Sequence, residues 1–135
     1  MKKPYVFKAF TEKYQNSTIE RNEASKIMRK LQTLMEEKKL YLNPTLSLFE
    51  LSAELSISSK ELSQVINQIE SKNYSQYISE YRVKEAQHLL TAPDYSKITI
   101  TAIAYDSGFN SISTFNSAFK KHSGMTAFEY RKANE

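Results

Sequence analysis

Two segments of this chain repeat one short pattern, and this repeat restricts the possible fold more than any other feature. In each segment a helix-start signal and apolar residues at helical spacing are followed by a break and a second helical stretch. A shift of 52 residues places Ser47, Leu48, Leu51, Ser52, Ser56 and Ile57 on Thr99, Ile100, Ile103, Ala104, Gly108 and Phe109. The second helical stretches of the two segments also align, once one extra residue is allowed in the later segment. The pattern indicates a diverged duplication of a helix-turn-helix unit.

Helix-start signals define the first unit. Ser47 with Glu50 forms one predicted capping box, and Ser58 with Glu61 forms another shortly afterwards. Two starts so close together predict a short helix, a tight turn and a second helix. The residues predicted to face inward are Leu48, Leu51 and Leu55 on the first helix and Leu62, Val65, Ile66 and Ile69 on the second.

Longer helical patterns precede and join the units. We predict a helix from an N-cap at Asn22 to about Lys39, ended before Pro44, because Asn43 is pushed out of the α region. A second long helix, about 74–91, should end before Pro93. Its predicted buried side consists of Tyr77, Ile78, Tyr81, Ala86, Leu89 and Leu90. Residues 1–21 show no sustained period and are predicted to be a partly flexible arm or linker.

Composition agrees with an all-α fold. Two glycines and three prolines among 135 residues leave little turn material for a β fold, and the absence of cysteine excludes disulfides and thiolate metal sites. The net charge of +4 is a weak indication of a polyanionic partner. We predict an all-α protein of about seven helices, in which a long central helix joins two helix-turn-helix units.

The second unit indicates what its exposed surface could bind. Ala104 is small enough for a close helix crossing, and Gly108 tolerates a positive φ in the turn. Three phenylalanines, Phe109, Phe115 and Phe119, are predicted to fill the core, which leaves the opposite face of the second helix free to reach base edges in a major groove. The candidate DNA-binding residues are Ile112, Ser113, Asn116, Ser117, Lys120 and Lys121, with Ser59, Lys60, Ser63, Gln64 and Asn67 as their counterparts in the first unit.

Each candidate also has a plain structural interpretation. Gln64 and Asn116 could be ordinary solvent-facing residues, and the two lysines could simply offset a helix dipole. Ile112 could contact a thymine methyl group or pack against Phe109. For Arg82 we expect a local ion pair with Glu85 in preference to a phosphate contact.

The stretch "IAYDSGFNSISTFNSAFKKHSGMTAFEYR" resembles the C-terminal signature of AraC/XylS-type transcriptional regulators. The matching residues are Ile103, Ala104, Gly108, Phe109, Ser113, Phe115, Phe119, Lys120, Lys121, Gly124, Thr126, Tyr130 and Arg131. The resemblance implies a sequence-specific DNA-binding domain over residues 22–135, with helix-turn-helix units at about 47–70 and 99–122. It further implies that recognition helices at about 58–69 and 111–122 enter successive major grooves.

Three positions depart from the family pattern. Ala127 replaces a usual proline, and Ser56 and Ser71 replace frequent glycines, which should cost local stability. The two recognition faces also lack arginine, the commonest reader of guanine, so we expect a preference for A·T-rich sites or for DNA shape.

The resemblance also implies partners and a setting. Double-stranded DNA is the expected ligand, RNA polymerase is a candidate partner, and no cofactor or small-molecule site is expected. We expect the chain to be the C-terminal part of a longer cytoplasmic or membrane-anchored regulator, whose sensing or dimerisation domain precedes residues 1–21.

Other classes of function have less support. The chain has no glycine-rich phosphate loop, paired-carboxylate motif or nucleophile beside a base, so we predict no catalysis. His88 and His122 lack the spacing of metal ligands. The remaining alternative is a helical protein-interaction module that does not bind DNA. Salt dependence of binding to generic duplex DNA would distinguish the two.

Overall fold

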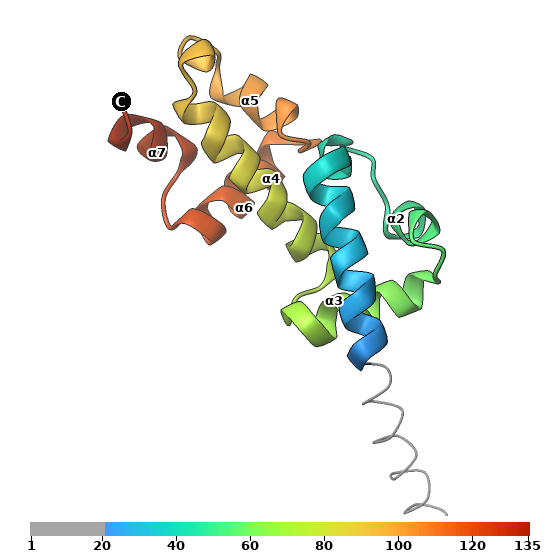
Figure 1. Ribbon diagram of the computed structural model, residues 1–135. Helices are drawn as coiled ribbons and strands as arrows, with labels where there is room; N and C mark the ends of the chain where they lie inside the picture. The colour runs from blue at the N-terminus through green and yellow to red at the C-terminus, as the bar shows by residue number, and fades with distance from the viewer. Residues whose placement is uncertain (1–20) are drawn as a thin grey trace, which may run out of the picture.

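The structure, a computed structural model, describes residues 21–135, and this part of the chain is helical without strands (Figure 1). A helix over residues 21–33 continues into the π-helical turn η1 (Leu34–Lys38) and the 3-10 turn η2 (Leu40–Leu42). The remaining elements are α2 (Leu48–Glu54), α3 (Ser59–Glu70), α4 (Tyr74–Thr91), η3 (Pro93–Tyr95), α5 (Ile100–Asp106), α6 (Ile112–Ser123) and α7 (Ala127–Ala133). The predicted all-α fold with two helix-turn-helix units and a long central helix is confirmed.

The N-terminal boundary differs in detail from the prediction. The predicted arm, residues 1–21, lies outside the described residues except for Arg21, which is already helical. Asn22 therefore lies inside the helix, and its predicted role as the N-cap is wrong. The helix ends at Lys38, before the proline, because Lys39 adopts a left-handed conformation with φ 49°. Asn43 is extended, as expected for a residue before proline.

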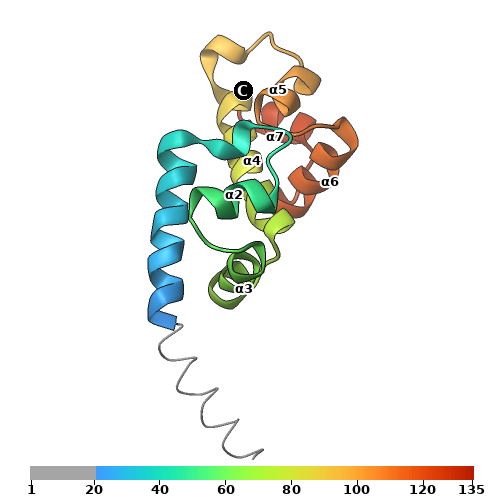
Figure 2. The ribbon, with the colours of Figure 1, turned by 90° about the vertical axis from the view of Figure 1, so that its right-hand side faces the viewer.

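The helices form two groups, one around each half of α4 (Figure 2), and each group encloses a hydrophobic core. The first contains residues of helix 21–33 and of α2 and α3, together with Tyr77 and Ile78 of α4. The second contains residues of α5, α6 and α7, together with Val83, Ala86, Leu89 and Leu90 of α4. The central helix thus contributes its first half to one core and its second half to the other.

Side-chain caps start the short helices. The backbone N–H of Glu50 donates to Ser47 Oγ at 3.0 Å, and the Ser47 N–H donates back to Glu50 Oε1 at 2.9 Å, which confirms the first predicted capping box. Ser58 accepts from the Glu61 N–H at 3.1 Å, but the return bond is not formed in the described structure. Thr126 with Glu129 forms a full box before α7, so this helix begins at buried Ala127 without the family's proline.

Some predicted core positions are corrected. Ile69 is 38% exposed because it lies in the last turn of α3, past the residues that pack in the core. Tyr81 is only half-buried, and Val83, which the sequence pattern missed, is 1% exposed. The buried face of α4 changes between Ile78 and Val83 because the helix changes cores there.

Two serines occupy left-handed positions at which the family often has glycine. Ser56 has φ 57° and Ser71, the C-cap of α3, has φ 56°. A non-glycine residue in the left-handed conformation lowers the stability of the folded state by about 1–2 kcal/mol. Glycine avoids this strain but lowers stability by about 0.4–1 kcal/mol, because it increases the entropy of the unfolded chain.

We predict that Ser71→Gly stabilises the protein by a few tenths to about 1 kcal/mol, because relief of the strain exceeds the entropic cost. The matched control is Ser75→Gly, an exposed position in the first turn of α4, where glycine should destabilise by about 0.5–1 kcal/mol. Urea unfolding followed by circular dichroism measures both. Equal effects of the two substitutions would show that Ser71 is not strained.

Candidate nucleic-acid interface

The turn of the second unit directs α6 away from α5. Gly108 has φ 100°, and the N–H of Phe109 donates to the carbonyl of Ala104 at 3.1 Å, which closes the turn. Ala104 is fully buried at the helix crossing. Both predictions for this turn, a small residue at the crossing and a glycine with positive φ, are confirmed.

Three phenylalanines hold α6 against the second core. Phe109 and Phe115 have ring centroids 5.3 Å apart, and Phe115 and Phe119 have centroids 5.5 Å apart. All three rings are at most 1% exposed. Because this face of α6 is buried, the opposite face is open to solvent, and the predicted residues exposed there are Ser113, Asn116, Ser117, Lys120 and Lys121.

Ile112 does not belong to this open face. It is half-buried and packs against the second core, so the structure supports the interpretation that it contacts the protein interior. Its contact with a thymine methyl group stays a prediction.

Fewer of the candidate DNA-binding residues are exposed on the first unit. Lys60, Gln64 and Asn67 are exposed on α3, while Ser59 and Ser63 are half-buried. Ser59 Oγ lies 3.3 Å from Ser52 Oγ of α2, so its hydroxyl faces the neighbouring helix. Lys60, Gln64 and Asn67 therefore form the outward face that is available to a ligand.

Gln64 stands at the edge of that face. It also lines a small cavity of about 80 Å³ between helix 21–33 and α3, together with Glu23, Ala24, Ile27 and Glu61 among others. The N-terminal helix therefore flanks the candidate reader in the first unit.

An open groove continues the exposed face of α6, and sequence reasoning missed it. Its volume is about 810 Å³, and its lining residues are Ile100, Asn116, Ser117, Lys120, Lys121, Thr126, Ala127 and Phe128. Phe128 is 59% exposed although it directly follows buried Ala127. The capping box at Thr126 was a local signal that placed residue 128 in the first turn of α7, but only packing shows which side it takes.

Charges around the groove have both signs. Lys120 and Lys121 are exposed cations in the last turn of α6. Hydrogen bonds from Thr126 lower the pKa of Glu129, and Lys120 acts in the same direction, so this carboxylate stays charged at neutral pH. The cationic edge of the groove is therefore the part suited to a phosphate.

Arg82 has a structural role, but not with the predicted partner. Its guanidinium donates to the backbone carbonyls of Tyr41 and Asn43, at 2.7 and 2.9 Å, and forms no ion pair with Glu85 among the described residues. The predicted local pair is wrong because two distant carbonyls compete successfully for the same donors.

Two other kinds of feature are absent from the described residues. Within residues 21–135, no group of three or more His, Cys, Asp or Glu side chains could hold a metal ion. None of the helices described is both long and apolar enough to span a membrane.

Comparison with known proteins agrees with this geometry. The sequence pattern of a helix-turn-helix domain family matches residues 51–133, which is more than half of the chain. An uncharacterized HTH-type transcriptional regulator, YdeC of Bacillus subtilis (strain 168), is 31% identical over 78 residues, which cover 58% of this chain and 26% of that protein. The chain thus spans about a quarter of the length of this relative.

Two solved structures with the same fold are C-terminal domains of response regulators. The C-terminal domain of AraT, a response regulator from Geobacillus stearothermophilus, is 25% identical with a TM-score of 0.66. The match covers 79% of this chain and 84% of the AraT domain. The C-terminal domain of the two-component response regulator yesN from Fusobacterium nucleatum subsp. nucleatum ATCC 25586 is 26% identical with a TM-score of 0.66. The match covers 77% of this chain and 96% of the yesN domain.

The family match covers both turns, both second helices and α4, which are the elements that build the exposed polar faces. Domains of this family are DNA-binding modules and not typically catalysts. The chain therefore belongs to the AraC-type helix-turn-helix family and is a DNA-binding domain of the transcriptional-regulator kind.

Proposed function

We propose that this domain inserts α3 and α6 into successive major grooves of double-stranded DNA and reads a specific sequence there. The observation that carries the proposal is the pair of exposed polar faces, Lys60, Gln64 and Asn67 on α3 and Ser113, Asn116 and Ser117 on α6. Polar side chains of this kind hydrogen-bond base edges, and amides pair with adenine. Lys120 and Lys121 supply phosphate contacts beside the second face.

Selection of bound duplexes from a random pool tests this proposal. A domain with two readers should recover two half-sites whose centres are about one helical turn, roughly 10 base pairs, apart. The half-sites should be rich in A·T pairs or share a groove shape, because neither face carries the arginine that commonly reads guanine. Recovery of no motif from a folded sample would favour a protein-interaction module instead.

We further propose that the two units divide the work. Gln64 and Lys60 are long side chains on the outer face of α3, whereas the exposed residues at the middle of α6 are short. The first unit should therefore supply most direct base readout, while the second contributes more through contacts with the DNA backbone.

Gln64→Ala should cost about 1–3 kcal/mol on the preferred site and relax the preference at one base pair. Lys121→Ala should instead weaken binding to all sequences alike and reduce the salt slope by about one unit, because it removes one phosphate contact. Fluorescence anisotropy across a salt series, with matched and single-mismatch duplexes, measures both. If Asn116→Ala loses discrimination while Gln64→Ala keeps it, the division of labour is reversed.

The finer setting of the domain is also a proposal. We propose that it is the C-terminal part of a longer cytoplasmic or membrane-anchored regulator with an upstream sensing or dimerisation domain. We also propose that RNA polymerase is a second partner and that the domain has no catalytic activity. Two relatives of this fold are C-terminal domains of response regulators, and the chain matches 26% of a longer curated relative. The genomic reading frame upstream of Met1 tests the first part. A start codon at Met1 with its own ribosome site would contradict it.

A further inference from the structure

The two helix-turn-helix units, each counted together with the segments that pack around its core, meet at one arginine. The first core ends at Ile78 of α4 and the second begins at Val83, so Arg82 lies where the central helix passes from one core to the other. Its side chain is half-buried. A cation in this position either costs stability through desolvation or must find partners that hold it in place.

The guanidinium of Arg82 has partners in both units. Nε donates to the carbonyl of Tyr41 at 2.7 Å, and Nη2 donates to the carbonyl of Asn43 at 2.9 Å, both in the segment that precedes α2. On the other side, Cζ lies 6.0 Å from the ring centroid of Phe109, the residue that follows the turn of the second unit. Arg82 thus ties the first unit to the second through a planar group with fixed geometry.

The backbones of the two units also touch at this point. A Cβ atom added at Gly108 would lie 2.3 Å from the carbonyl oxygen of Tyr41 and 2.9 Å from Arg82 Nε. The turn of the second unit therefore packs directly on the carbonyl that Arg82 binds. A contact between backbones leaves no side-chain rotamer through which the units could shift.

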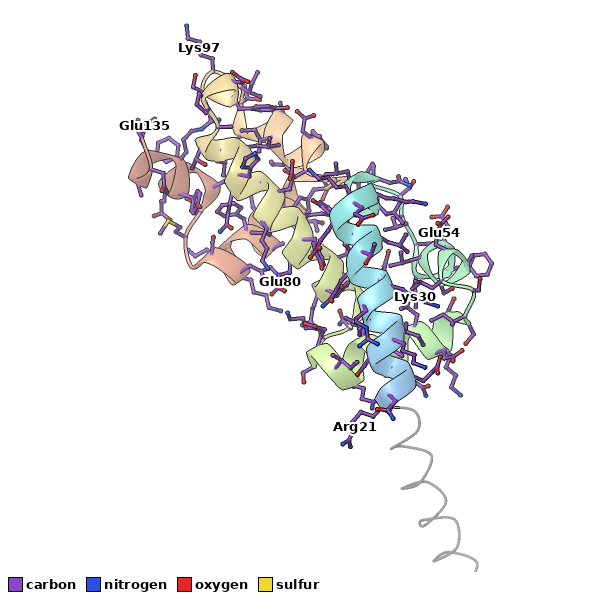
Figure 3. All side chains as sticks on the ribbon, viewed as in Figure 1. Arg21, Lys30, Glu54, Glu80, Lys97 and Glu135 are labelled. Atoms are coloured by element: carbon purple, nitrogen blue, oxygen red, sulfur yellow. The ribbon has the colours of Figure 1, made fainter. Side chains whose placement is uncertain are left out.

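A second tie lies on another side of α4. Glu80, labelled in Figure 3, accepts a hydrogen bond from Lys72 Nζ through Oε1 at 2.7 Å. Its Oε2 lies 3.9 Å from His122 Nδ1 near the end of α6, a contact that becomes an ion pair when the imidazole is protonated. Glu80 and Arg82 are two residues apart, so they leave the helix in directions that differ by about 200°. Two ties on opposite sides of one helix resist both bending and rotation of the units.

We propose that the Arg82 junction is a positioning device that fixes the distance and rotational phase between α3 and α6, and thereby selects the spacing of the two half-sites. The proposal rests on the proposed function, because it assumes that both helices read DNA. One extra base pair moves a half-site by about 3.4 Å and turns it by roughly 35° around the duplex. A junction held by backbone contacts cannot follow that displacement without losing hydrogen bonds.

The test compares Arg82→Met with a matched control. Arg131 also donates to two backbone carbonyls, from Nη1 to Ile98 at 2.8 Å and from Nη2 to Tyr95 at 3.0 Å, but all these residues lie within the second unit. Arg131→Met therefore removes the same chemistry without touching the junction. Binding is measured on duplexes that carry the selected half-sites at the selected spacing and with one or two base pairs added or removed.

The parent and Arg131→Met should lose affinity on the order of tenfold or more for a change of one base pair. Arg82→Met should lose roughly threefold or less, while its base preferences within each half-site stay unchanged. Glu80→Gln weakens the second tie at a partly exposed position and should likewise reduce the loss of affinity caused by a changed spacing. This variant replaces Arg82→Met in the test if Arg82→Met does not fold. A parental spacing profile in both junction variants would overturn the proposal, and so would equal relaxation in Arg131→Met.

A measurement without DNA separates this inference from the proposed function. The chain has no cysteine, so spin labels can be placed selectively at Ala53→Cys on α2 and Thr101→Cys on α5, two exposed positions in different units. The distance distribution between the labels should broaden with Arg82→Met and stay narrow with Arg131→Met. An unchanged distribution in Arg82→Met overturns the junction, whatever the DNA result. Failure of the parent to bind any duplex, with the distributions as expected, would overturn the proposed function and the selection of half-site spacing, but not the rigid junction.

Discussion

Gly108→Ala is expected to lower the free energy of unfolding by about 2–5 kcal/mol, because the substitution combines two costs. The residue has φ 100°, a conformation that an L side chain adopts at a cost of about 1–2 kcal/mol. The new Cβ would also lie 2.3 Å from the Tyr41 carbonyl oxygen and 3.0 Å from Leu42 Cα, so backbone atoms of the first unit must move. Overpacking of this kind adds about 1–3 kcal/mol.

Gly124→Ala is the matched control for the first of these costs. Gly124 has φ 80° at the end of α6, and a Cβ added there would meet no atom within 4 Å. Its expected cost is only about 1–2 kcal/mol, from the backbone conformation alone. Urea unfolding by circular dichroism gives both values. Equal losses would mean that the contact between the units does not contribute to the requirement for glycine at 108.

Phe119→Ala is expected to destabilise the protein by about 3–5 kcal/mol. Its ring is fully buried and lies 5.5 Å from the Phe115 ring centroid and 5.6 Å from that of Tyr130, so truncation opens a cavity between α6 and α7. The loss of transfer free energy and of packing contacts both contribute.

Phe128→Ala removes the same side chain from a surface position. Phe128 is 59% exposed on α7, where the described structure gives it a cation–π contact with Lys132 at 5.7 Å. Substitution there should change stability by at most about 0.5 kcal/mol. The two variants are compared by their urea midpoints at equal slope. A Phe128→Ala variant as unstable as Phe119→Ala would show that the groove beside α7 is closed in solution.

Much of the fold was predictable because its causes are local. The capping pair Ser47 and Glu50 and the glycine at 108 act over a few residues, so their types and spacing predict the helix starts and the turn. The same reasoning identified Phe115 and Phe119 as buried and the opposite face of α6 as exposed, because the helical period relates the two faces.

Parts of the candidate site depended on how these elements pack. Ile112 and Ser59 were predicted on the outer faces, yet Ile112 packs on the second core and the Ser59 hydroxyl faces Ser52. Each lies three residues before a fully buried residue, Phe115 or Leu62, so the helical period already places both beside the buried stripe. What the assembled structure adds is the neighbour that each residue meets there, namely Ser52 of α2 for Ser59 and the second core for Ile112.

The sequence by itself determined the all-α class, the duplication, the two turns and the faces that α3 and α6 expose, because each follows from contacts within one helix or one turn. Tertiary structure alone decided how the two units join. Arg82 binds carbonyls that are 41 and 39 residues away, in preference to the nearby Glu85. Position 108 needs glycine for its positive φ and also because the Tyr41 carbonyl leaves no room for a side chain. These contacts depend on the placement of α4 between two cores, and no spacing of residues along the chain encodes that placement directly.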